Sequence, residues 1–150
     1  MDRSHVFLDS SVIVAALLSP RGGSYYVLTQ LNDRLTFHVN EYVLAEMQDL
    51  ISVKFKNQPQ LLAQFFLLLG LAGVETLGNP SQKTLRSVSS LISKKDAPIL
   101  AGAMAACDYL VTLGNEFLSL DVMTPAREKG LTILRPGDLI ALFRSVMHEK

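Results

Sequence analysis

Residues 5–18 read HVFLDSSVIVAALL, and this stretch decides the class of fold. The apolar run His5–Leu8 predicts a short strand that ends at Asp9. Ser11–Leu18 then predicts a helix, because its apolar residues continue without the alternation of a half-buried strand. A strand that leads directly into a helix is the beginning of a βα unit, so strands and helices are expected to alternate along the chain.

The remaining sequence continues this alternation of short apolar runs and helical spacing. Further strands are predicted at Leu35–Val39, Tyr109–Thr112 and Leu131–Leu134, and Val74–Leu77 is predicted as a brief strand or an extended segment. Further helices are predicted at Ser24–Asp33, at 41–55 with Asn40 as N-cap, at 58–72, at 80–93 with Pro80 in the first turn, from Lys95, Asp96 and Pro98 through ILAGAMAA, and over LIALFRSVM after residues 136–138.

Strands separated by helices predict an α/β fold, a three-layer sandwich with a mainly parallel central sheet. The run YLVT at Tyr109–Thr112 has no alternation, which is typical of a strand that is covered on both faces. No linker, repeat or low-complexity stretch divides the 150 residues, and 49% of them are hydrophobic. A single domain over residues 1–150 is therefore expected.

The charge total excludes broad electrostatic attraction to a polyanion. Fourteen Lys and Arg residues balance fourteen Asp and Glu residues, so neither nucleic acid nor an anionic membrane is attracted non-specifically.

The most apolar segment, LLAQFFLLLGLAG at 61–73, is shorter than the ~20 residues that span a bilayer, and it predicts a core helix or a dimer face. The single Cys107 cannot form an internal disulfide, and its small apolar neighbours predict a buried, inert thiol. A reducing, cytoplasmic location without membrane contact is therefore expected.

Acidic and polar residues lie where two of the predicted strands end, where one helix opens and inside another helix. In an open parallel sheet, ligands bind at the carboxyl ends of the strands, near a switch in strand order. Asp9 follows the first strand, and residues 112–116 follow the YLV strand. Glu46 lies inside a helix and Asp96 lies where a helix opens. Each has a structural alternative: Asp9 as a turn or capping residue, Glu46 as a solvated glutamate and Asp96 as a helix-capping acid.

Three stretches taken together resemble a PIN domain: VFLDSSVIVAALLSPRGGS, EYVLAEMQDLISVKF and KKDAPILAGAMAACDYLVT. The resemblance runs in order over nearly the whole chain, and GLTILRPGDLIALF is similar to the terminal strand and helix of that family. A haloacid-dehalogenase-type phosphatase needs a second Asp where this chain has Ser11. A phosphoreceiver domain needs paired acids after the first strand, and they are not present.

The resemblance implies a cluster of metal-binding catalytic acids. Asp9, Glu46 and Asp96 match the acids that PIN domains place after the first strand, inside a helix and at the start of the helix before the YLVT strand. Ser11 and Thr112 match supporting hydroxyl residues of the family.

The fourth acid of the family is replaced in this chain. Family members usually place an Asp two residues after the threonine that corresponds to Thr112, and this chain has Gly114 there. Glu116 is the nearest carboxylate, so either Asn115 or Glu116 is expected to stand in as the missing ligand.

The resemblance implies a metal-dependent endoribonuclease that hydrolyses RNA phosphodiester bonds with water activated by Mg²⁺ or Mn²⁺. It also implies the toxin half of a toxin–antitoxin pair, with an antitoxin protein as partner, and a homodimer is expected. The alternative is a catalytically weakened PIN-fold binding or assembly module that lacks the fourth acidic ligand. Residues that bind substrate are not assigned; the candidates that could rim the centre, or form only a solvated surface set, are Lys54, Lys56, Lys94, Lys95 and Arg21.

Overall fold

The computed structural model describes residues 3–148 and is built around one parallel sheet. The strands are β1 (Ser4–Leu8), β2 (Leu35–Asn40), β3 (Glu75–Leu77), β4 (Tyr109–Val111) and β5 (Thr132–Leu134). They lie in the order β3-β2-β1-β4-β5, and each neighbouring pair is parallel. The prediction of an α/β fold with a mainly parallel sheet is therefore confirmed.

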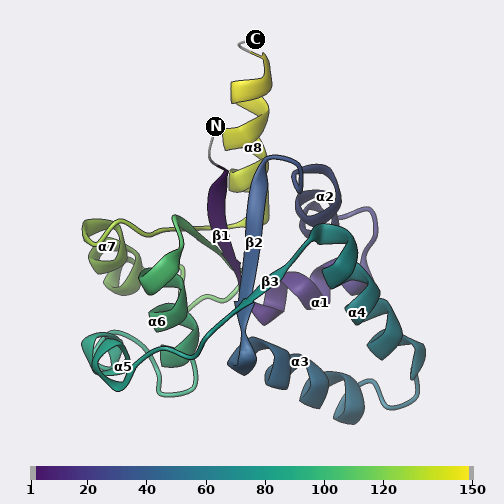
Figure 1. The fold of residues 1–150 in the computed structure, drawn as a ribbon, viewed down its shortest axis with the longest axis horizontal. Helices are drawn as coiled ribbons and strands as arrows, with labels where there is room; N and C mark the ends of the chain where they lie inside the picture. Colours follow the sequence, from purple (N-terminus) through teal and green to yellow (C-terminus); the bar gives the residue numbers. More distant parts are fainter. Residues whose placement is uncertain (1–2, 149–150) are drawn as a thin grey trace.

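Helices cover both faces of this sheet. They are α1 (Ser10–Leu18), α2 (Gly23–Gln30), α3 (Glu41–Val53), α4 (Gln60–Ala72), α5 (Gln82–Val88), α6 (Ala97–Ala106), α7 (Leu120–Glu128) and α8 (Pro136–His148). Figure 1 shows the sheet nearly edge-on, with α1, α2 and α4 on one side and α5, α6 and α7 on the other. The helix α3 begins directly where β2 ends, so it lies at the carboxyl ends of the strands.

Two helices differ from the prediction. The helix α5 begins at Gln82 because Ser81 is its N-cap and accepts a hydrogen bond from the Thr84 amide, so Pro80 precedes the helix and does not occupy its first turn. The helix α7 was not predicted. Pro125, which is unfavourable inside a helix, lies within it, and Val122 and Ala126 are its only buried residues.

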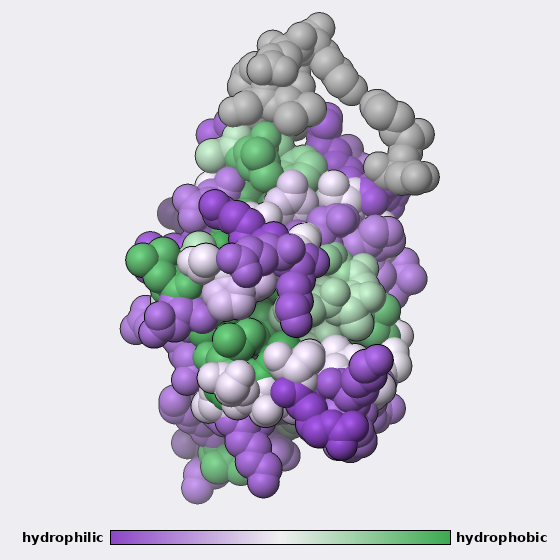
Figure 2. Space-filling model, turned by 90° about the vertical axis from the view of Figure 1, so that its left-hand side faces the viewer, coloured by the Kyte–Doolittle hydropathy of each residue, from purple (hydrophilic) through white to green (hydrophobic). Residues whose placement is uncertain are grey.

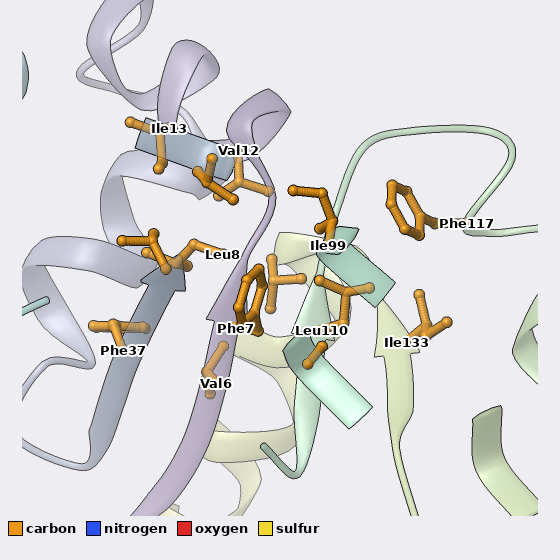
Figure 3. Close-up of a cluster of buried hydrophobic side chains, with 14 of the residues drawn as sticks. Val6, Phe7, Leu8, Val12, Ile13, Phe37, Ile99, Leu110, Phe117 and Ile133 are labelled. Atoms are coloured by element: carbon orange, nitrogen blue, oxygen red, sulfur yellow. The ribbon is translucent and has the colours of Figure 1, made fainter. Parts of the chain in front are cut away.

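The core forms where the central strands meet the helices of both layers. Phe7 and Phe37 of the two central strands and Leu110 of β4 are fully buried, and Ile99 of α6 packs against them (Figure 3). Phe117 is also buried, at 3% exposure, and its ring anchors the loop that follows β4 (Figure 3). This loop therefore has a defined position above the carboxyl end of the sheet.

Two features outside the sheet bear on the predictions from sequence. In the part of the chain that the structure describes, no helix has the length and apolar character needed to cross a bilayer. Cys107 follows α6 and is partly buried, and burial raises the pKa of its thiol to about 12. The thiol therefore stays protonated at neutral pH, as expected for an inert cysteine.

Candidate metal centre

Asp9 lies at the switch point of the sheet. The chain runs from β1 through β2 to β3 on one side, and then returns to place β4 on the other side of β1. Asp9 directly follows β1, and its backbone amide donates to the carbonyl of Val111, the last residue of β4, at 3.1 Å. Its side chain is only 6% exposed. The carboxylate therefore lies in the crevice where open parallel sheets bind their ligands.

Two hydroxyl groups hold the Asp9 carboxylate in place. Ser11 Oγ donates to Asp9 Oδ2 at 2.7 Å, and Thr112 Oγ1 donates to the same oxygen at 2.8 Å. The same hydroxyls accept hydrogen bonds from the loop after β4: Leu113 N donates to Ser11 Oγ at 3.0 Å, and Gly114 N donates to Thr112 Oγ1 at 2.9 Å. Ser11 and Thr112 thus connect the Asp9 side chain to this loop and fix its orientation.

The environment of Asp9 disfavours an uncompensated negative charge. Burial raises the pKa of the Asp9 carboxyl above its ordinary value. The hydrogen bonds from Ser11 and Thr112 lower this pKa, whereas the neighbouring Glu46 carboxylate raises it. A cation beside Asp9 would remove this conflict, because it would stabilise the ionised form of a carboxylate that two donors already orient.

Glu46 reaches the same crevice from α3. Asn40, at the end of β2, caps α3 by accepting a hydrogen bond from the Val43 amide at 3.2 Å, and this cap sets where the helix leaves the sheet. The Glu46 side chain accepts a hydrogen bond from the Ser10 hydroxyl, and its Oε2 lies 3.7 Å from Nζ of Lys95. The Glu46 side chain is 30% exposed, so it lies at the rim of the crevice rather than fully in solvent.

Asp96 lies on the opposite rim, directly before α6. Although it occupies the N-cap position, its side chain makes no capping hydrogen bond, so helix capping does not account for it. Burial raises the pKa of Asp96 to about 6, with further contributions from a hydrogen bond to Glu116 and from the charges of Asp9 and Glu116. Ser93 Oγ donates to Asp96 Oδ2 at 3.3 Å and partly offsets this effect.

Glu116 is exposed and pairs with Asp96. Its Oε1 accepts a hydrogen bond from the Ser93 amide at 3.3 Å, and hydrogen bonds from Ser93 and from Asp96 lower the pKa of Glu116. Of the two coupled carboxyls, Asp96 is therefore the one that keeps a proton to higher pH. Of the two candidates for the fourth ligand, both exposed, Glu116 interacts with one of the other acids, Asp96.

Gly114 lies next to Asp9. A Cβ atom added at Gly114 would lie 3.8 Å from Asp9 Oδ2, 3.3 Å from Thr112 Oγ1 and 3.4 Å from Cδ2 of Phe117. A side chain at this position would thus enter the crevice beside Asp9. The absence of an acid at Gly114 removes a carboxylate from the buried side of the cluster, and Glu116 supplies one only on the exposed side.

The four acids are connected by three electrostatic links. Asp9 is linked to Glu46 and to Asp96 by charge repulsion, and Asp96 is linked to Glu116 by a hydrogen bond. Within residues 3–148, no three Asp, Glu, His or Cys side chains already stand in an arrangement that would hold one ion. Shared binding of a metal ion would require Glu46 to leave Lys95 and Asp96 to be ionised.

The donor set suits a hard divalent cation. Carboxylate and hydroxyl oxygens are the ligands preferred by Mg²⁺ and Mn²⁺, and soft sulfur ligands are not part of the cluster. The role of Asp9, Glu46, Asp96 and Glu116 as metal ligands remains a prediction. The structure adds two residues that the sequence analysis did not select, Ser10 and Ser93, which bond to Glu46 and to the Asp96–Glu116 pair.

Comparison with known proteins places this geometry in a family. A family model described as PIN domain matches residues 5–115, a range that includes Asp9, Glu46, Asp96 and Gly114 and ends one residue before Glu116. A comparison with curated proteins gave no match.

Two solved structures share the fold. One is VapBC2 from Rickettsia felis, whose crystal structure was solved with a bound fragment of promoter DNA. It is 23% identical in sequence with a TM-score of 0.66, and the match covers 87% of this chain and 98% of that chain. PAE2754 from Pyrobaculum aerophilum is 15% identical with a TM-score of 0.61, and the match covers 95% of this chain and 90% of that chain. At these identities the two structures support the fold alone.

Proposed function

The chain belongs to the PIN domain family, whose members are generally nucleases, and from this premise we propose that it is a Mg²⁺- or Mn²⁺-dependent endoribonuclease. The observation that carries the proposal is the buried Asp9 carboxylate, which two hydroxyls orient while Glu46 and Asp96 act on it electrostatically. Buried carboxylates at the carboxyl ends of strands, in mutual repulsion, are what a site for a divalent cation requires.

The proposed roles follow from how each side chain is held. Asp9 would bind the cation from the floor of the crevice, because Ser11 and Thr112 prevent its rotation. Glu46 and Asp96 would bind from the two rims, and Glu116 would complete the site beside Asp96. A bound divalent cation supplies charge neutralisation at the phosphate and lowers the pKa of coordinated water. Because the pKa of Asp96 is about 6, its carboxylate form, which can act as a ligand, predominates above that pH.

Replacement of Asp9 by Asn tests the proposal. Asn retains an oxygen that accepts the hydrogen bonds from Ser11 and Thr112 but lacks the negative charge, so the fold is expected to persist while the cation is lost. Purified wild-type chain is expected to cleave RNA with Mn²⁺ and to stop in excess chelator. Asp9→Asn is expected to reduce the rate by at least about a hundredfold, which is the low end for loss of a group that stabilises charge in the transition state. Cleavage that persists in Asp9→Asn or in chelator would identify a contaminating nuclease and remove the proposal.

A second function, a PIN-fold binding or assembly module with weakened catalysis, is favoured by Gly114. This residue removes the acid that would stand beside Asp9 in the floor of the crevice. If the wild-type chain binds Mn²⁺ and RNA but does not cleave, this second function is the correct one.

We also propose that the chain acts as the toxin of a toxin–antitoxin pair. The shared fold with VapBC2, a protein solved in complex with promoter DNA, supports this role. Induced expression in a bacterial host is expected to arrest growth with the wild-type chain but not with Asp9→Asn. Arrest by both proteins would show that growth inhibition does not depend on the acidic cluster.

A further inference from the structure

A hollow of about 580 Å³ opens between the first turn of α3, the helix α5 and the start of α6. Its wall combines the aromatic ring of Tyr42, the cationic side chains of Arg86 and Lys94, and the apolar surface of Leu85 and Pro98. Tyr42 is 42% exposed, so its ring is available to a ligand. This volume lies within the range of about 300 to 1,000 Å³ of pockets that hold small ligands.

Two chain segments that line the hollow also carry acids of the cluster. Tyr42 lies four residues before Glu46 on α3, and positions four apart lie on the same face of a helix. Lys94 and Pro98 lie two residues before and two residues after Asp96. A ligand in the hollow would therefore be flanked by the chain segments that carry two of the predicted metal ligands.

The wall of the hollow complements one kind of ligand. Among the lining residues that the structure describes there is no carboxylate, although four acids lie in the neighbouring cluster. Arg86 and Lys94 complement a phosphate group, and the Tyr42 ring, with Leu85 and Pro98 beside it, offers a surface on which a base can stack. Figure 2 shows the side of the molecule that carries α5 and α7, where hydrophilic and hydrophobic residues are interspersed. A ligand on this side would therefore make both polar and apolar contacts.

We propose that the hollow at Tyr42, Arg86 and Lys94 is a subsite for one nucleotide of single-stranded RNA, next to the phosphodiester that the acidic cluster would cleave. The proposal rests on the proposed nuclease function and adds where the substrate strand lies. A single strand is required because the bases of an RNA duplex are stacked within the helix and cannot reach an aromatic side chain. The neutral total charge agrees with such local contacts, since two cations at one place do not need a broadly basic surface.

The test measures RNA binding without cleavage. The full chain is mixed with a fluorescein-labelled single-stranded RNA 12-mer in two parallel buffers, one containing Ca²⁺ and one treated with chelator. The dissociation constant is measured by fluorescence anisotropy at several salt concentrations. The variants are Arg86→Gln/Lys94→Gln, Tyr42→Leu and Tyr42→Phe. The matched control is Arg127→Gln/Lys129→Gln, which removes two exposed cations at the end of α7, outside the hollow.

We expect Arg86→Gln/Lys94→Gln to weaken binding about tenfold and to reduce the slope of log K against log salt by about 0.7 for each lost phosphate contact. Tyr42→Leu should weaken binding roughly tenfold because stacking is lost, and Tyr42→Phe should bind like the wild type. The control should change neither quantity. A purely structural role of these side chains would not change the salt slope or separate Phe from Leu at position 42.

Two results would overturn the subsite. One is an affinity and salt slope of Arg86→Gln/Lys94→Gln equal to those of the control. The other is RNA binding that is unchanged while sedimentation shows that the variants convert a dimer to a monomer, because the hollow would then be occupied by a second copy of the chain. Because the experiment measures binding, it separates the two proposals. If the wild-type chain binds RNA without cleaving it, and the variants bind RNA more weakly, the nuclease function is refuted and the subsite is supported.

Discussion

Gly114 is the residue at which this chain departs most clearly from its family. A Cβ atom at this position would enter the crevice 3.8 Å from Asp9 Oδ2, and the tightest contact, 3.3 Å to Thr112 Oγ1, requires a shift of only a few tenths of an ångström. We expect Gly114→Asp to tighten Mn²⁺ binding by roughly tenfold or more, since even outer-shell partners change metal affinity by that amount. Isothermal titration calorimetry of Mn²⁺ and the rate of RNA cleavage measure this effect.

Gly114→Ala is the control, because it adds the same Cβ without a charge. In chelator, Gly114→Asp should have a lower melting temperature than Gly114→Ala, since a further carboxylate repels Asp9. Addition of Mn²⁺ should reverse this order through ligand linkage. If Gly114→Asp has the Mn²⁺ affinity and cleavage rate of the wild type, the missing acid does not limit the site.

The carboxyl of Asp96 makes stability depend on pH. Its pKa is about 6 in the folded chain against 3.8 for the free side chain, so the folded state holds a proton that the unfolded state has lost between these values. The free energy of unfolding should therefore fall as pH rises from about 4 to about 6 in metal-free buffer. Urea unfolding across this range measures the slope, and Asp96→Asn, which cannot titrate, should reduce it. An equal slope in both proteins would contradict the assignment.

His38 contributes the opposite slope, which is why the comparison with Asp96→Asn is needed. His38 is 5% exposed, its Nε2 lies 2.8 Å from Nδ1 of His5, and its own Nδ1 is buried without a partner in the described structure. Burial lowers the pKa of His38, and the charge of His5 lowers it further. Stability from this group is present above its unfolded pKa of about 6.5 and is lost as pH falls below that value.

At the level of elements, Gly102 sets how closely α6 packs on the sheet. A Cβ atom there would lie 2.7 Å from Nδ2 of Asn40 and 3.3 Å from Cε2 of Phe7. Asn40 Nδ2 also donates to the carbonyl of Pro98 at 3.2 Å, so this contact joins the end of β2 to the first turn of α6. We expect Gly102→Ala to destabilise the fold by about 1–3 kcal/mol through overpacking, although Ala favours helix. The free energy of unfolding in urea measures this cost.

Gly70→Ala is the matched control for the helix propensity of the substitution. Gly70 lies in α4 with nothing within 4 Å of an added Cβ, so alanine there should stabilise the fold by up to about 1 kcal/mol. If both substitutions are stabilising, close packing of α6 does not require glycine at position 102.

The elements that were predicted well are those with strong local signals. Asn40 predicts a helix start, the apolar run before Asp9 predicts a strand, and the small residues of ILAGAMAA predict a helix packed on the sheet. Each of these patterns is only a few residues long. The helix α7 was missed although its boundaries carry local signals: Ser119 precedes it, Asp121 lies in its first turn and Arg127 lies in its last turn. Pro125 inside the helix, and a buried face of only two residues, argue against a helix when the sequence is considered alone.

At the level of the whole molecule, α4 presents an apolar face to solvent. Leu67 is 64% exposed and Leu71 is 62% exposed, and they lie four residues apart on one side of the helix. We propose that this face is where two copies of the chain meet, as the apolar segment 61–73 led us to expect. Leu67→Lys/Leu71→Lys is expected to convert a dimer to a monomer, because two charges would be buried at the interface. Sedimentation or light scattering measures the mass.

Leu120→Lys is the control for this experiment. Leu120 is 78% exposed at the start of α7, away from α4, so its replacement should not change the mass of the particle. A wild-type chain that is monomeric at all concentrations would remove the dimer proposal and leave the α4 face to a different protein, such as an antitoxin.

The sequence by itself determined the order of the elements other than α7, the parallel α/β architecture and the acids to consider, because each of these follows from patterns within a few residues. Only the tertiary structure decided which of them meet. Thr112 reaches Asp9 across 103 positions because β4 lies beside β1, and Glu116 reaches Asp96 because Phe117 anchors its loop to the core. Strand order and the position of the loop depend on contacts between residues that are distant in sequence, so no local sequence pattern predicts them. For the same reason the replacement of an acid by Gly114 was visible in the sequence, but its position beside Asp9 was visible only in the fold.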